Sequence, residues 1–184
     1  LAQAFPELRL RAAQMLERDP ALRDRLVVAG VGGPSGTGLD QPSALTDLSS
    51  ALGLDDVVRF IPTVSQTGLA DWYAAATTVC VPSYNESFGL VAIEAQACGT
   101  PVVAARVGGL STAVFDGVTG VLVDGHDPAD YASAMLPLLT DPDLREAMSQ
   151  KAVHHAESFG WDVTAERTLA VYADAIAAHA EVAV

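Results

Sequence analysis

The chain has 184 residues, of which 50% are hydrophobic and 18% are charged, a composition typical of one globular domain and not of a disordered segment. Its formal net charge is −13, and Lys151 is the only lysine in the sequence. Nucleic acids and anionic membrane surfaces are bound through clustered lysine and arginine, so this charge pattern excludes both as partners.

In chain order, the hydrophobic pattern predicts a helix over 6–19, a strand over 25–31, a helix over 43–52, a strand over 57–62, a helix over 68–76 and a strand over 79–82. A helix over 89–98, strands over 101–105 and 120–124, and three helices over 127–140, 141–159 and 161–179 follow. The strands are aliphatic throughout, which is typical of strands buried on both faces. This alternation predicts a single α/β domain with a doubly wound parallel sheet and extra C-terminal helices.

The lengths of the apolar runs and the two cysteines predict a cytoplasmic protein. No apolar run reaches the roughly 18 residues of a membrane-spanning helix, and no signal peptide is recognisable. Cys80 and Cys98 lie in apolar runs without metal-site spacing, so both are predicted as small buried side chains in a reducing compartment. The sequence does not open on methionine, and we expect it to be a piece of a longer protein.

The predicted ligand face lies beyond the carboxyl ends of the strands. The loops expected there are rich in glycine, serine, threonine and asparagine, and they cover residues 32–38, 62–68, 83–89 and 107–110. In the third loop, the first N–H groups of the helix that follows have no partner within the helix, and together with the helix dipole they form an anion site suited to a phosphate. Gly89 allows close approach to the backbone, and Ser87 adds a hydroxyl.

Two carboxylates, Glu86 and Glu94, stand out because few charged residues surround them. A carboxylate accepts two hydrogen bonds at once and therefore matches a vicinal diol, such as that of a sugar ring or a ribose. An alternative interpretation makes Glu86 a charge at the start of a helix and Glu94 a solvated residue. The apolar residues around Glu94 favour a functional role, since a buried carboxylate needs partners.

These residues also resemble a known family. The spacing from Glu86 to Glu94, the Gly-Thr-Pro at 99–101, the glycine pair at 108–109 and the segment at 116–123 are similar to the donor-nucleotide domain of retaining GT-B glycosyltransferases of family four. A closer pattern, at 32–36, 81–110 and 122–128, resembles the actinobacterial subfamily of mycothiol biosynthesis. That subfamily transfers N-acetylglucosamine from UDP-N-acetylglucosamine to 1D-myo-inositol 3-phosphate with retention.

The resemblance implies a role for each matching residue. Glu86 would contact the hydroxyls of the donor sugar and stabilise an oxocarbenium-like transition state, and Glu94 would bind the ribose diol. The backbone at 62–64, ending at Val64, would meet the uracil. Sugar and phosphate oxygens would be held by the N–H groups of four consecutive residues, Ser87, Phe88, Gly89 and Leu90.

The resemblance implies no cofactor for the chemistry, but it includes a possible structural magnesium ion. The matching positions are Tyr73, Ala74, Ala76 and Thr100, which would contribute mostly carbonyl oxygens. The family position next to Tyr73 is often arginine, and here it is Ala74.

Two departures from the family concern the phosphates and the acceptor. The family carries an arginine and a lysine on the loop after the first strand of this domain; the arginine position precedes this chain, and alignment on Pro6 places the lysine position at Ala4. We also expect the acceptor domain, which would bind inositol phosphate, to lie outside this chain. We therefore expect the chain alone to bind UDP weakly and to transfer little. The full-length parent is expected to be active, and a homodimer of that parent is among the expected assemblies.

Three alternatives remain open from the residues. In the first, the parent belongs to the same family but uses a sugar-phosphate or a lipid-linked inositol acceptor. In the second, the domain is a non-catalytic nucleotide-binding remnant, and in the third it is part of a sugar-nucleotide epimerase. Among the other residues, Arg59 is predicted to lie at the surface and Arg106 to hold a phosphate or a loop. Trp161 is predicted to pack between domains, and the four histidines (126, 154, 155 and 179) are predicted to be solvated.

Overall fold

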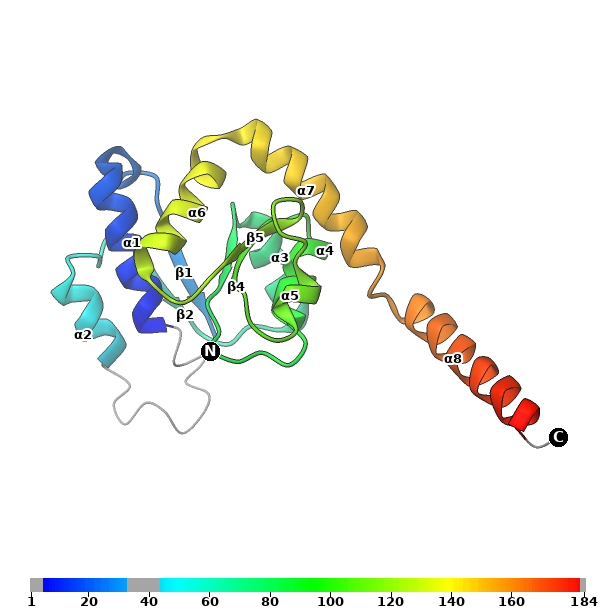
Figure 1. Ribbon diagram of the computed structural model, residues 1–184. Coiled ribbons are helices and arrows are strands. Elements are labelled where there is room, and N and C mark those ends of the chain that lie inside the picture. Colours follow the sequence, from blue (N-terminus) through cyan, green and yellow to red (C-terminus); the bar gives the residue numbers. More distant parts are fainter. Residues whose placement is uncertain (1–4, 33–43, 183–184) are drawn as a thin grey trace.

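The computed structural model describes residues 5–32 and 44–182 (Figure 1). Ala4 and most of the loop expected after the first strand lie outside these residues. The described part consists of short parallel strands covered by helices, which confirms the predicted α/β class.

The described strands form two parallel sheets. In the first, β1 (Val28–Val31) pairs with β2 (Val58–Ile61). In the second, β4 (Val102–Ala105) lies between β3 (Val79–Val81) and β5 (Gly120–Val123). The sequence predicted one sheet, whereas β1 and β3 are not hydrogen-bonded to each other in the structure.

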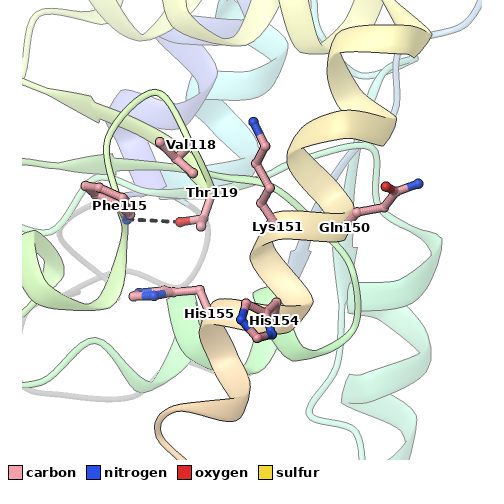
Figure 2. A pocket seen from close by; sticks show the side chains of 7 residues that line it. All are labelled: Phe115, Val118, Thr119, Gln150, Lys151, His154 and His155. Atoms are coloured by element: carbon pink, nitrogen blue, oxygen red, sulfur yellow. Dashed lines mark hydrogen bonds between the residues drawn. The ribbon is translucent and has the colours of Figure 1, made fainter.

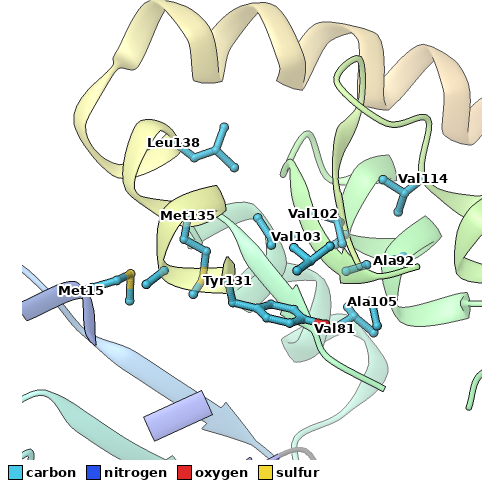
Figure 3. Close-up of a cluster of buried hydrophobic side chains, with 14 of the residues drawn as sticks. Met15, Val81, Ala92, Val102, Val103, Ala105, Val114, Tyr131, Met135 and Leu138 are labelled. Atoms are coloured by element: carbon cyan, nitrogen blue, oxygen red, sulfur yellow. The ribbon is translucent and has the colours of Figure 1, made fainter. Parts of the chain in front are cut away.

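The central strand β4 is completely buried, as its run of small aliphatic residues predicts. The helices that surround the strands are α1 (Phe5–Arg18), α2 (Ala44–Ala51), α3 (Gln66–Ala75), α4 (Leu90–Ala97), α6 (Pro128–Thr140) and α7 (Pro142–Glu157). Figure 3 shows the core, in which Tyr131 and Met135 of α6 extend toward the side chains of the second sheet. Arg11 of α1 is fully buried, with its guanidinium carbon 4.0 Å from the centre of the Tyr131 ring.

The helix ends follow local capping chemistry. Asp127 and Asp141 precede α6 and α7, and each side chain accepts backbone N–H bonds from the first turn, ahead of a proline at the first helical position. The bounds of the predicted helices agree with the structure to within a few residues. The structure adds two short elements that no period in the sequence predicts: a 3₁₀ helix at Pro20–Leu22 and α5 (Leu110–Ala113).

The last helix, α8 (Trp161–Val182), extends away from the rest of the molecule (Figure 1). Its apolar side chains are exposed: Trp161 by 88%, Leu169 by 66% and Ile176 by 71%. None of the described helices combines the length and the apolarity of a bilayer-spanning segment. Both cysteines are free thiols, and burial raises the pKa of Cys80 to about 12.

Candidate functional site

The candidate site is the turn between β3 and α4. Gly89 ends this turn with a φ of +87°, a left-handed conformation that favours glycine. Glu86 holds the turn through two of its groups. Its carboxylate Oε1 accepts the N–H of Gly89 at 3.3 Å, and its carbonyl accepts the N–H of Gly109 at 2.9 Å.

The glycine pair Gly108–Gly109 packs directly against this turn. A Cβ atom on Gly109 would lie 2.5 Å from the Cα atom of Phe88, and one on Gly108 would overlap the carbonyl oxygen of Glu86. Gly108 also has a φ of +46°. These two positions therefore need glycine because a neighbouring backbone occupies the space of a side chain.

The sequence-predicted residues at 86–90 lie together at the start of α4. Ser87, Phe88 and Leu90 are exposed, and Gly89 is buried. Within the described residues, the N–H groups of Leu90 and Val91 have no hydrogen-bond acceptor. Outward N–H groups at the positive end of a helix favour an anion, so this turn has the chemistry of a phosphate site.

Glu94 lies one turn further along α4 and is half-buried. Its Oε2 accepts a hydrogen bond from the hydroxyl of Tyr73 in α3 at 3.2 Å. Burial, followed by the charge of Glu94, raises the pKa of Tyr73 well above its ordinary value, so this phenol stays protonated and donates. Val64 lies apart from this pair, half-buried in the loop between β2 and α3.

The contacts around Tyr73 do not favour a magnesium ion. The carbonyl of Tyr73 already accepts the hydroxyl of Thr100 at 2.6 Å and the N–H of Ala76 at 3.1 Å. The four predicted positions, which include Ala74, provide no carboxylate, whereas magnesium in proteins is usually bound through one or two carboxylates or through substrate phosphates. This donor set does not fit the magnesium ion that the resemblance implies.

Arg106 and Arg59 both make structural contacts. Arg106 pairs with Asp116 at 2.6 Å and with Asp124 at 2.9 Å, so it ties together the loops on either side of β5. The sequence left two roles open for Arg106, holding a phosphate or holding a loop, and these contacts correspond to the second. Arg59 donates to the carbonyl groups of Asp55, Asp56 and Val58, and it lies at the surface, as predicted.

His126 belongs to the surroundings of the turn, which the sequence did not predict. Its ring stacks on Tyr84, with centroids 3.9 Å apart and planes 6° from parallel. Its Nε2 lies 3.2 Å from the carbonyl of Ser83, so a hydrogen bond there requires Nε2 to carry the proton. Only its place just after the fifth predicted strand, at the ligand face, would have suggested this contact.

A separate hollow of about 400 Å³ lies between α7 and the loop before β5 (Figure 2). It is lined by Phe115, Val118, Thr119, Gln150, Lys151, His154 and His155, and thus by none of the residues of the turn. His154 is exposed, as predicted, whereas His155 is half-buried against Phe159.

Comparison with known proteins connects this geometry to a family. The profile of the family described as "Glycosyl transferases group 1" matches residues 4–155. A D-inositol 3-phosphate glycosyltransferase from Kribbella flavida is 62% identical over 168 residues, which are 91% of this chain and 40% of that protein. The chain thus spans about two fifths of the length of the curated relatives that it matches.

Two solved structures are similar to the described fold. Sucrose-phosphate synthase from Thermosynechococcus elongatus is 32% identical, with a TM-score of 0.78, over 95% of this chain and 43% of that one. Anabaena Alr3699/HepE in complex with UDP-glucose is 27% identical, with a TM-score of 0.71, over 85% of this chain and 43% of that one.

Proposed function

Because the chain belongs to the glycosyl transferases group 1 family, we propose that it is the donor-binding part of a longer retaining glycosyltransferase. This enzyme would transfer N-acetylglucosamine from UDP-N-acetylglucosamine to 1D-myo-inositol 3-phosphate. The observation that carries the proposal is the 62% identity, across 91% of the chain, to a relative named D-inositol 3-phosphate glycosyltransferase. The donor class is further supported by the similarity to a protein solved with UDP-glucose.

In this proposal, different residues of the turn and of α4 bind different parts of the nucleotide-sugar donor. The start of α4 binds the pyrophosphate through backbone N–H groups, which suits a chain with one lysine. Glu86 contacts the sugar hydroxyls and stabilises positive charge at the anomeric carbon, and Glu94 accepts the ribose diol. The loop that ends at Val64 contacts the uracil.

The acceptor is proposed to bind to the part of the longer protein that this chain does not span. A sugar-phosphate acceptor is a second candidate, favoured by the similarity to a sucrose-phosphate synthase. Assays of the longer protein with inositol 3-phosphate and with fructose 6-phosphate separate the two. Transfer to inositol 3-phosphate with an α-linked product supports the first candidate, and transfer only to fructose 6-phosphate contradicts it.

Donor binding is testable on the chain itself. Calorimetric titration with UDP and UDP-N-acetylglucosamine is expected to give weak binding, with amide shifts at residues 87–91 in nuclear magnetic resonance spectra. Glu94→Ala is expected to weaken the binding of both nucleotides about tenfold or more, the value of a hydrogen-bonded charged group. Glu157→Ala, on the exposed face of α7, serves as the matched control. The absence of any UDP binding would contradict the proposal.

A further inference from the structure

The contact between Tyr73 and Glu94 joins two helices at the proposed ribose site. Tyr73 is the buried side chain of α3, with 8% of its surface exposed, and its hydroxyl lies 3.2 Å from Oε2 of Glu94. In the part of the chain that the structure describes, this is the only hydrogen bond that the Glu94 carboxylate makes. The orientation of Glu94 therefore depends on one donor.

Among the residues that the structure describes, no cation near Glu94 takes the place of that donor. No described arginine or lysine pairs with Glu94. A further charge nearby, that of Asp71, is also negative: burial first, and then the charges of Glu94 and Asp71, raise the pKa of Cys98. A half-buried carboxylate without a cation needs neutral donors. Tyr73 supplies one, and a bound diol would supply two more.

A hydrogen bond to the backbone carbonyl of Tyr73 fixes the position of this residue. The hydroxyl of Thr100, which is 2% exposed, donates to the carbonyl of Tyr73 at 2.6 Å. The N–H of Thr100 donates in turn to the carbonyl of Ala95 in α4 at 3.0 Å. Thr100 thus connects the end of α3 to the same helix that carries Glu94, and this fixes the separation of the two side chains.

We propose that Tyr73 is a positioning residue for nucleotide recognition: its hydroxyl holds Oε2 of Glu94, so that Oε1 and the remaining lone pair of Oε2 accept the two ribose hydroxyls. This inference rests on the proposed function, because it assumes a ribose at Glu94. It gives a role to the hydroxyl of Tyr73, whereas the metal site implied by the resemblance would use the backbone carbonyl of this residue. The contribution of Tyr73 is to orient a carboxylate before the ligand arrives.

The test compares UDP with 2′,3′-dideoxyuridine diphosphate, which lacks the diol. We expect the wild-type chain to prefer UDP about tenfold, and Tyr73→Phe to reduce that preference about fivefold, the size of one net hydrogen bond. The affinity for the dideoxy nucleotide is expected to change less than about twofold. In the Glu94→Ala background, which leaves the Tyr73 hydroxyl no side-chain oxygen to hold, Tyr73→Phe is expected to have no further effect on the preference. Tyr172→Phe, on exposed α8, is the matched control.

The outcomes separate the two claims. A wild-type chain that binds neither nucleotide overturns the proposed function and this inference with it. A chain that prefers UDP and keeps the preference in Tyr73→Phe overturns only the role of Tyr73, as does an equal loss for both nucleotides, which marks a purely structural contact. Thr100→Val gives a second route if Tyr73→Phe does not fold, and it is expected to lower the UDP preference in the same selective way.

Discussion

At the scale of single residues, Glu86 has a structural role in the turn and a proposed role at the donor sugar, and removing its side chain would affect both. Its carboxylate and its carbonyl both stabilise the turn, through the N–H groups of Gly89 and Gly109. The proposed contact with the donor sugar would use the rest of the same carboxylate. Removing the side chain would therefore disturb the phosphate site as well as the sugar site.

Glu86→Gln separates these tasks, because the amide oxygen of glutamine still accepts the N–H of Gly89. We expect UDP affinity to stay within about twofold of wild type, whereas transfer by the longer protein falls about 100-fold or more, as when one group that stabilises transition-state charge is removed. Calorimetry and an initial-rate assay measure the two quantities. Undiminished transfer would contradict a charge-stabilising role for Glu86, and Glu86→Ala, expected to lose both properties, is the comparison.

Asp116 gives a prediction about stability and pH. The backbone N–H of Leu122, and then Arg106, hold the pKa of Asp116 below its ordinary value. A lowered folded-state pKa means that its stabilisation is fully present above about pH 4, the usual Asp value, and is lost as pH falls through the folded-state pKa. The urea midpoint of Asp116→Asn is expected to lie below wild type near neutral pH and to converge with it in acid. Asp174→Asn, on exposed α8, is expected to show no such pH dependence.

The residues that the sequence identified share one property, which is closeness along the chain. Glu86, Gly89 and Glu94 could be predicted because they form a local motif at a helix start. The pairs Tyr73–Glu94 and Ser83–His126 are separated by 21 and 43 positions, and their contacts arise only when the elements pack. No pattern in a single sequence links such residues.

At the scale of elements, the glycine pair before α5 determines where the turn before α4 lies. Gly108 and Gly109 let one backbone pass directly against the other, and the N–H of Gly109 closes a hydrogen bond across the contact. The alternation of strands and helices could be predicted from hydrophobic periodicity. The split into two sheets could not, since pairing between strands depends on contacts that no local period encodes.

Gly108→Ala tests this contact, with Gly117→Ala as its matched control. Both glycines have positive φ values, +46° and +71°, but no atom of the described residues lies within 4 Å of a Cβ atom on Gly117. We expect Gly117→Ala to cost about 1–2 kcal/mol of stability from backbone strain alone. Gly108→Ala is expected to cost about 2–5 kcal/mol, because overlap with Glu86 adds to that strain. Urea unfolding measures both, and equal costs would mean that the close approach does not matter.

At the scale of the whole molecule, the net charge of −13 opposes any anionic ligand. A nucleotide approaches through this field before it reaches the N–H groups of α4. Salt shortens the range of the repulsion, since the Debye length falls from about 30 Å at 0.01 M to about 10 Å at 0.1 M. Binding to this chain therefore differs from binding to a basic protein, in which salt weakens attraction.

We expect the association rate constant of UDP to rise when ionic strength increases from about 0.01 M to about 0.1 M, where screening is strong. Stopped-flow measurement with a fluorescent UDP analogue gives this rate constant. Uridine, which is uncharged, is the control and is expected to show no salt dependence. A fall in the rate constant with salt would indicate a local cation at the site that outweighs the net charge.

The projecting helix α8 affects how unfolding of this chain can be measured. Trp161 begins α8 and is 88% exposed, whereas Trp72 belongs to α3 and is 36% exposed. A helix with few packed side chains has little tertiary stabilisation and melts at lower temperature than a core. In the variant Trp161→Phe, Trp72 is the only tryptophan and its fluorescence reports the body of the molecule. On heating this variant, circular dichroism, which reports all helices, is expected to lose signal before the fluorescence of Trp72 changes. A single melting temperature would describe the body of the molecule and not α8.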